Sequence, residues 1–224
     1  MKSTIAYSFA FLAVAAVCTG SVLGGREQMN RRIAAIFAAL FPTVICFAQE
    51  ATPQTKLVEA ARAQVGVTTV YDPAYVSLSY PGGDVPIDRG VCTDVIIRAL
   101  RASLNIDLQR TVHEDMASHF SLYPTVWGLT KPDKNIDHRR VPNLRTYFRR
   151  HAIFLKVSKQ PSAYQPGDLV TSMLPKNLPH VMIVSDKKNS SGVPLVIHNI
   201  GRGAREQDCL FTYPITGHYR LRFR

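Results

Sequence analysis

The sequence predicts an α+β domain in which helices come first and a run of strands follows. In the first part of the domain, apolar residues recur at helical spacing, over residues 56–65 and again over residues 92–104. From residue 152 onward the apolar period changes to two, which is typical of strands. Helices followed by consecutive strands indicate an α+β order rather than an alternating α/β one.

The first 48 of the 224 residues are expected to be an export region. Residues 29–32 (MNRR) are followed by an apolar run of about 14 residues and by Ala48, the pattern of a secretory signal peptide. We interpret residues 29–48 as the signal peptide and residues 1–28 as an upstream extension. The alternative is that the uncharged residues 3–25 are a membrane anchor. Either way, the single domain of residues 49–224 is expected in the periplasm or outside the cell.

The net charge is +11, of which residues 1–48 contribute +3. A basic surface attracts polyanions. The basic residues show neither interleaved aromatic residues nor a nucleic-acid motif. We therefore expect an anionic polymer of the cell envelope as partner, and no nucleic acid; a role in solubility alone is the alternative. The oligomeric state is not predicted.

The helices can be placed in order. Residues 56–65 form a short amphipathic helix that ends at Gly66, and a loop rich in Tyr, Pro and Gly covers residues 71–90. The clearest helix runs from residue 92 to about residue 104. Residues 106–140 are polar and predicted to be irregular, and Pro142 then begins a helix over residues 142–150.

The strands follow. They are predicted at residues 152–157, 168–174, 180–185, 195–199 and 219–223. The segment 186–194 (DKKNSSGVP) is a turn by composition. It should join the two strands beside it as an antiparallel hairpin.

Two cysteines, Cys92 and Cys209, remain after the export region. In an oxidising compartment the two could simply pair as a disulfide. Cys92, however, lies at the start of a helix, where the partial positive charge of the helix end favours the reactive thiolate. A buried, inert cysteine is the equally weighted alternative at this stage, and Cys209 is expected to be a spare buried thiol.

Two histidines lie on the predicted hairpin. His180 begins one strand and His198 is near the end of the next. If the strands pair, the two imidazoles can lie side by side, so that His180 acts as a base and His198 orients it. A metal site of Cys92, His180 and His198 is not predicted, because the spacing matches no compact zinc pattern. No cofactor is expected.

Five motifs occur in an order that resembles the NlpC-type cell-wall cysteine peptidases. They are Tyr80-Pro81-Gly82-Gly83, Val91-Cys92-Thr93-Asp94, residues 165–170 (QPGDLV), residues 180–184 (HVMIV) and Ile197-His198-Asn199. A closer likeness, over nearly all of residues 56–224, is to a family of uncharacterised secreted bacterial proteins classed as a domain of unknown function. Its hallmarks are similar to residues 71–73 (YDP), 135–144 (NIDHRRVPNL) and 215–220 (ITGHYR).

The resemblance implies a papain-like core, in which the helix that carries the cysteine packs on a small antiparallel sheet. It implies Cys92 as nucleophile, His180 as base, His198 as third member and Tyr80 as an oxyanion or substrate contact. Thr93 and Asp94, beside the nucleophile, are assigned to the same binding role. The sequence departs from the usual Asp-Cys-Ser-Gly here, and the insert at about residues 106–150 is expected to reshape the substrate groove.

We therefore predict an exported thiol-dependent hydrolase that cleaves amide bonds, in peptidoglycan stem peptides, through a Cys-His-His arrangement. Two alternatives remain. One is a catalytically inactive module that binds the cell envelope. The other is acyl transfer on a lipid or a protein.

Overall fold

The computed structural model of this protein describes residues 50–222. The signal peptide and the alternative anchor predicted for residues 1–48 lie outside the described residues. Over residues 50–222, none of the helices has the length and apolar character needed to cross a membrane.

Within residues 50–222, four α-helices precede the main sheet: α1 (Pro53–Arg62), α2 (Cys92–Leu104), α3 (Leu108–His119) and α4 (Val141–His151). Side chains cap the starts of α1, α2 and α3; at the start of α2 the Asp94 carboxylate accepts the backbone N–H of Val91 at 2.7 Å. Helix α2 ends at Leu104, because the next residue, Asn105, has a left-handed backbone (φ 54°) that stops the helical repeat. The first residue of α2 is therefore Cys92, as predicted.

Short elements fill the connections. Strand β1 (Val70–Tyr71) pairs in parallel with β2 (Arg89–Gly90), and this brings Tyr71 opposite Gly90, two residues before Cys92. Single 3-10 turns occur at Phe120–Leu122, Asp137–Arg139, Pro161–Ala163 and Pro175–Asn177.

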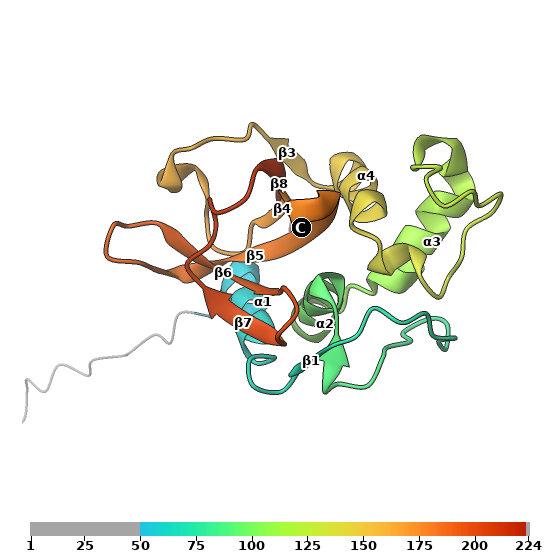
Figure 1. Cartoon of the computed structure of the whole chain (residues 1–224), viewed down its shortest axis with the longest axis horizontal. Coiled ribbons are helices and arrows are strands. Elements are labelled where there is room, and N and C mark those ends of the chain that lie inside the picture. Colours follow the sequence, from blue (N-terminus) through green and yellow to red (C-terminus); the bar gives the residue numbers. More distant parts are fainter. Residues whose placement is uncertain (1–49, 223–224) are drawn as a thin grey trace, which may run out of the picture. The chain divides into compact units, whose positions relative to one another are not determined.

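The main sheet has six antiparallel strands in the order β3-β8-β4-β5-β6-β7 (Figure 1). In sequence order they are β3 (Ile153–Leu155), β4 (Leu169–Leu174), β5 (Leu178–Lys188), β6 (Pro194–Asn199), β7 (Ala204–Gln207) and β8 (Ile215–Arg220). Strands β5 and β6 form the predicted hairpin. The domain is thus α+β with a small antiparallel sheet.

The two faces of the sheet bury different side chains. One face packs against the helices, and its core includes Val181, Ile183 and Ile197 together with the apolar side of α2. The opposite face has a smaller cluster that includes Met182 and Val184. Because side chains alternate along a strand, His180 and His198 share this second face with Met182.

Several elements differ from the sequence-based expectation. The first helix spans Pro53–Arg62, not residues 56–65, and the last strand, β8, spans Ile215–Arg220, not residues 219–223. Residues 106–140 are not irregular throughout, because α3 occupies residues 108–119. The apolar side of this helix has only one residue per turn, at Leu108, Val112 and Met116, so its helical periodicity is weak in the sequence. Strand β7 was not predicted, since its sequence AREQ lacks apolar alternation at the sheet edge.

Candidate active site

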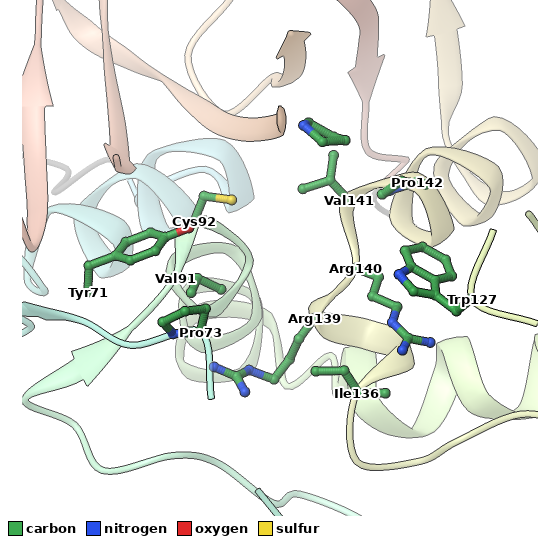
Figure 2. A pocket seen from close by; sticks show the side chains of 11 residues that line it. Tyr71, Pro73, Val91, Cys92, Trp127, Ile136, Arg139, Arg140, Val141 and Pro142 are labelled. Carbon is green, nitrogen blue, oxygen red and sulfur yellow. The ribbon is translucent and has the colours of Figure 1, made fainter. Parts of the chain in front are cut away.

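Cys92 lines a cavity of about 220 Å³ between the β1–α2 region and the insert (Figure 2). On the near wall stand Tyr71, Pro73 and Val91. The opposite wall comes from the insert and the start of α4, and includes Trp127 and Arg140. In Figure 2 the sulfur of Cys92 points toward this opposite wall. The insert therefore forms one side of the cavity that holds the thiol.

The Cys92 thiol is protonated at neutral pH. The residue is 6% exposed. Burial raises the pKa of the thiol to about 11, although the backbone N–H of Val181 donates to the sulfur and lowers it in part. The backbone N–H groups of Cys92 and Thr93 at the helix start lower the pKa of the thiol, as expected, but desolvation of the anion outweighs them.

The two predicted histidines lie side by side. His180 Nε2 is 2.8 Å from His198 Nδ1, and His198 Nε2 is 3.1 Å from Gln207 Oε1 on β7. The amide oxygen of Gln207 can only accept, so His198 carries its proton on Nε2 and its Nδ1 accepts from His180 Nε2. This arrangement leaves the Nδ1 atom of His180 without a proton, as a base requires.

His180 is also uncharged in the folded protein. Burial, together with the neighbouring His198, lowers the pKa of His180 to about 3. The Cys92 sulfur faces the N–H of Val181, the residue after His180. Among the hydrogen bonds of residues 50–222, none joins the sulfur to either histidine. By the alternation of side chains along β5 and β6, both imidazoles lie on the sheet face opposite the one on which α2 packs.

Thr93 and Asp94 do not face the cavity. Thr93 is fully buried and its hydroxyl donates to the carbonyl of Arg139 at 3.2 Å. Asp94, 2% exposed, holds the guanidinium of Arg139 through two contacts of 2.9 Å. The predicted role in substrate binding is contradicted by this burial; both residues instead fix the insert onto the start of α2.

Tyr80 is placed elsewhere as well. Its ring packs edge-on against His113, with centroids 5.2 Å apart, and it is not part of the cavity wall. Tyr71 occupies the place expected of Tyr80, and its phenol oxygen lies beside Cys92 in Figure 2. Burial raises the pKa of Tyr71, and a charge on Cys92 would raise it further. The phenol therefore keeps its proton and can donate a hydrogen bond.

Two residues of the site were missed in the sequence, Tyr71 and Gln207. Tyr71 belongs to the YDP segment, whose resemblance to a family hallmark was the available signal. Gln207 had none, because its strand was not predicted.

Cys209 lies on the far side of His198. Its sulfur is 3.5 Å from His198 Nε2, and burial raises the pKa of this thiol to about 11. Both Cys92 and Cys209 are free thiols, so the predicted alternative of a disulfide is wrong. Among the side chains of residues 50–222, no group of three His, Cys, Asp or Glu is arranged to hold a metal ion.

Comparison with known proteins agrees with the closer of the two resemblances. Residues 58–221 match the family described as Domain of unknown function DUF1287. The chain belongs to this family. It is also 55% identical over 182 residues to the Uncharacterized protein YijF of Escherichia coli (strain K12), a match that covers 81% of this chain and 87% of YijF. No solved structure matched significantly.

The DUF1287 match includes every residue of the site. Tyr71, Cys92, His180, His198 and Gln207 all fall within residues 58–221. The cavity wall contributed by the insert also falls within it. The geometry described above is therefore contained in the family domain, and residues 1–48 lie outside it.

Proposed function

We propose that this DUF1287 protein is a thiol-dependent hydrolase that cleaves amide bonds. The proposal rests on two observations: a thiol at the start of α2 that lines a cavity and accepts the backbone N–H of Val181, and a buried His180–His198–Gln207 chain that starts one residue earlier on the same strand. A protonated thiol needs a neutral base to become a nucleophile, and His180 is neutral with Nδ1 unprotonated.

The reaction begins with both groups uncharged. When an amide carbonyl enters the cavity, His180 Nδ1 takes the thiol proton as the sulfur of Cys92 attacks the carbonyl carbon. The protonated His180 then gives this proton to the leaving amine, and the C–N bond breaks to leave a thioester. Water, deprotonated by His180, hydrolyses the thioester and restores the thiol.

Two donors can stabilise the oxyanion that forms. The backbone N–H of Cys92, as the first residue of α2, has no partner within the helix. The phenol of Tyr71 stands beside the thiol and keeps its proton. His198 and Gln207 touch no reacting atom and act as positioning residues for His180.

Peptidoglycan stem peptides are the proposed substrate. The order of the motifs resembles NlpC-type cell-wall peptidases, in which a papain-like core carries the same residue types, and helix α2 packs on β5 as such a core requires. The basic composition and the signal-like residues 29–48 support a target outside the cytoplasm.

A binding module without catalysis is the second candidate. The high pKa of Cys92 and the lack of a sulfur–imidazole hydrogen bond in residues 50–222 favour it. Acyl transfer to a lipid or a protein would use the same thioester and differ only in the acceptor.

Incubation of the full chain with purified peptidoglycan separates these functions. Mass spectrometry of the released fragments should show new amine and carboxyl termini with the native protein and none with Cys92→Ala. Co-sedimentation with peptidoglycan but without fragments would instead favour the binding module. Release of fragments by Cys92→Ala would overturn the proposal.

A further inference from the structure

The wall opposite Cys92 carries two neighbouring arginines in different situations. All parts of the Arg139 guanidinium are engaged: it is paired with Asp94 and donates to the carbonyls of Ala74 and Asp72. Its side chain is 3% exposed. Arg139 thus holds the fold together and has little capacity left for a ligand.

Arg140 is held in place, but most of its N–H donors have no hydrogen-bond partner within residues 50–222. Its guanidinium lies over the ring of Trp127, with the central carbon 4.1 Å from the ring centroid. One nitrogen contacts Asp137 at 3.2 Å, and no other hydrogen bond of this side chain occurs within residues 50–222. An arginine has five N–H donors. The indole face and Asp137 therefore orient the guanidinium and leave most of its donors available.

The charge of the cavity wall is one-sided. Arg139 and Arg140 are its charged members, and within the described part of the chain no carboxylate lines it. Asp137, the partner of Arg140, is fully buried, and burial raises the pKa of its carboxyl group, which weakens it as a counter-ion. An anion is the complementary ligand for such a wall.

The cavity is also small. Its volume is about 220 Å³, and Cys92 and Arg140 stand on opposite walls of it. A ligand with its amide at Cys92 and an anion at Arg140 spans only this cavity. We therefore take the anion to belong to the residue at the cleaved bond or to the residue next to it.

We propose that Arg140, held on Trp127, binds a substrate carboxylate at or next to the cleaved amide. The ligand class is an acidic peptide, and the planar guanidinium gives the two-point contact that a carboxylate prefers. This inference rests on the proposed function, because it takes the bound peptide to be the substrate. The binding site itself can be tested without catalysis.

Trp127 makes the test direct, because it is the single tryptophan of the chain. The full chain carrying Cys92→Ala is titrated with stem peptides from purified peptidoglycan, in their acidic form and after conversion of their carboxylates to carboxamides. Tryptophan fluorescence and isothermal calorimetry are recorded together. We expect saturable binding of the acidic form and at least about tenfold weaker binding of the amidated form.

Variants identify the arginine. Arg140→Gln should weaken binding of the acidic peptides about tenfold or more and leave the amidated ones unchanged, with Arg140→Lys in between. Arg202→Gln removes the same charge from an exposed position outside this cavity and should have no effect. Equal affinity for the two peptide forms, binding by Arg140→Gln equal to that of its parent, or no binding of either form would overturn the inference.

The two proposals fail separately. If the native chain cleaves no peptide while Cys92→Ala binds the acidic form through Arg140, hydrolysis is wrong and the carboxylate site stands. If the native chain cleaves acidic and amidated peptides with equal kcat/KM, hydrolysis stands and the carboxylate site is wrong.

Discussion

Two buried histidine clusters lie on the same face of the sheet. In the first, His180 contacts His198, which contacts the neutral Gln207. In the second, His218 Nε2 is 2.7 Å from Asp168, and Arg220 holds the same carboxylate with two contacts of 2.7 Å. The ring of Tyr164 stacks on His218, with centroids 4.3 Å apart.

The second cluster has the histidine–carboxylate pair that enzymes use, yet it is closed. Asp168 is 1% exposed, and all hydrogen-bond partners of its carboxylate belong to the neighbouring strand or to the loop before its own strand. The first cluster contains no charge, but it begins at His180, one residue before the Val181 N–H that the sulfur of Cys92 accepts, and this thiol lines a cavity. The comparison shows that a nearby nucleophile and a place for substrate decide which histidine is the candidate base. A carboxylate partner does not.

The largest expected difference between the clusters is in catalysis. His180→Gln removes the base and should lower kcat by at least about 10³-fold, comparable to Cys92→Ala. His218→Gln, the matched change in the other cluster, should leave kcat per folded molecule within a few-fold. Hydrolysis of stem peptides measures both. Equal losses in the two variants would mean that the second cluster takes part in the reaction.

The next effect is on stability. Asp168→Asn leaves Arg220 and His218 without a charged partner and should lower the free energy of unfolding by about 3 kcal/mol. Asp186→Asn, in an ion pair whose carboxylate is 48% exposed, is the control and should cost less than about 1 kcal/mol. Urea denaturation monitored by circular dichroism gives both values. A small effect of Asp168→Asn would show that the closed cluster does not hold the sheet.

The clusters should also differ in their response to acid. The pKa of His180 is about 3 in the folded protein and 6.5 without the fold. The unfolded chain therefore binds more protons in this range, and stability falls as pH drops from 6.5 toward 3. Between pH 6.5 and pH 5 the free energy of unfolding should fall by about 2 kcal/mol.

Asp168 acts lower. Burial raises its pKa, but hydrogen bonds from Arg220 and His218 hold the pKa below its usual 3.8, so its contribution is lost only as pH falls below that value. His180→Gln should accordingly flatten the stability curve between pH 6.5 and pH 5, measured by thermal unfolding. An unchanged slope would show that His180 is not buried as a neutral group.

The smallest effect concerns Gln207. Gln207→Ala removes the acceptor that sets the proton on His198 Nε2 and should lower kcat about tenfold, about 1.4 kcal/mol. Gln207→Glu places a carboxylate there, which favours protonated His198 and should move the acidic limb of the kcat profile to higher pH. A loss of activity without a shift of that limb would mean that Gln207 matters only for packing.

The sequence predicted α2, and the place of Cys92 at its start, correctly because the signal is local; the role of Cys92 as nucleophile stays a prediction. A wide apolar face at helical spacing marks this helix without reference to anything else. The hairpin that joins β5 and β6 is local in the same way, since its turn composition lies between two apolar strands. The positions of His180 and His198 followed from it.

The residues that were missed depend on contacts between distant segments. Gln207 reaches His198 only because β7 pairs with β6, and Tyr71 reaches Cys92 only because β1 pairs with β2. Tyr80 was chosen because of its Gly-Gly neighbours, but its loop packs against α3 through His113. Periodicity describes one segment at a time and contains no information about these pairings.

By itself, the sequence determined which thiol and which two histidines could form the site, and that they belong to a helix start and a hairpin. Only the tertiary structure decided their charge. Packing against the sheet removes water from Cys92 and His180, so the thiol keeps its proton and the imidazole stays neutral. A pKa depends on what surrounds the group in space, and segments far apart in the chain provide those surroundings.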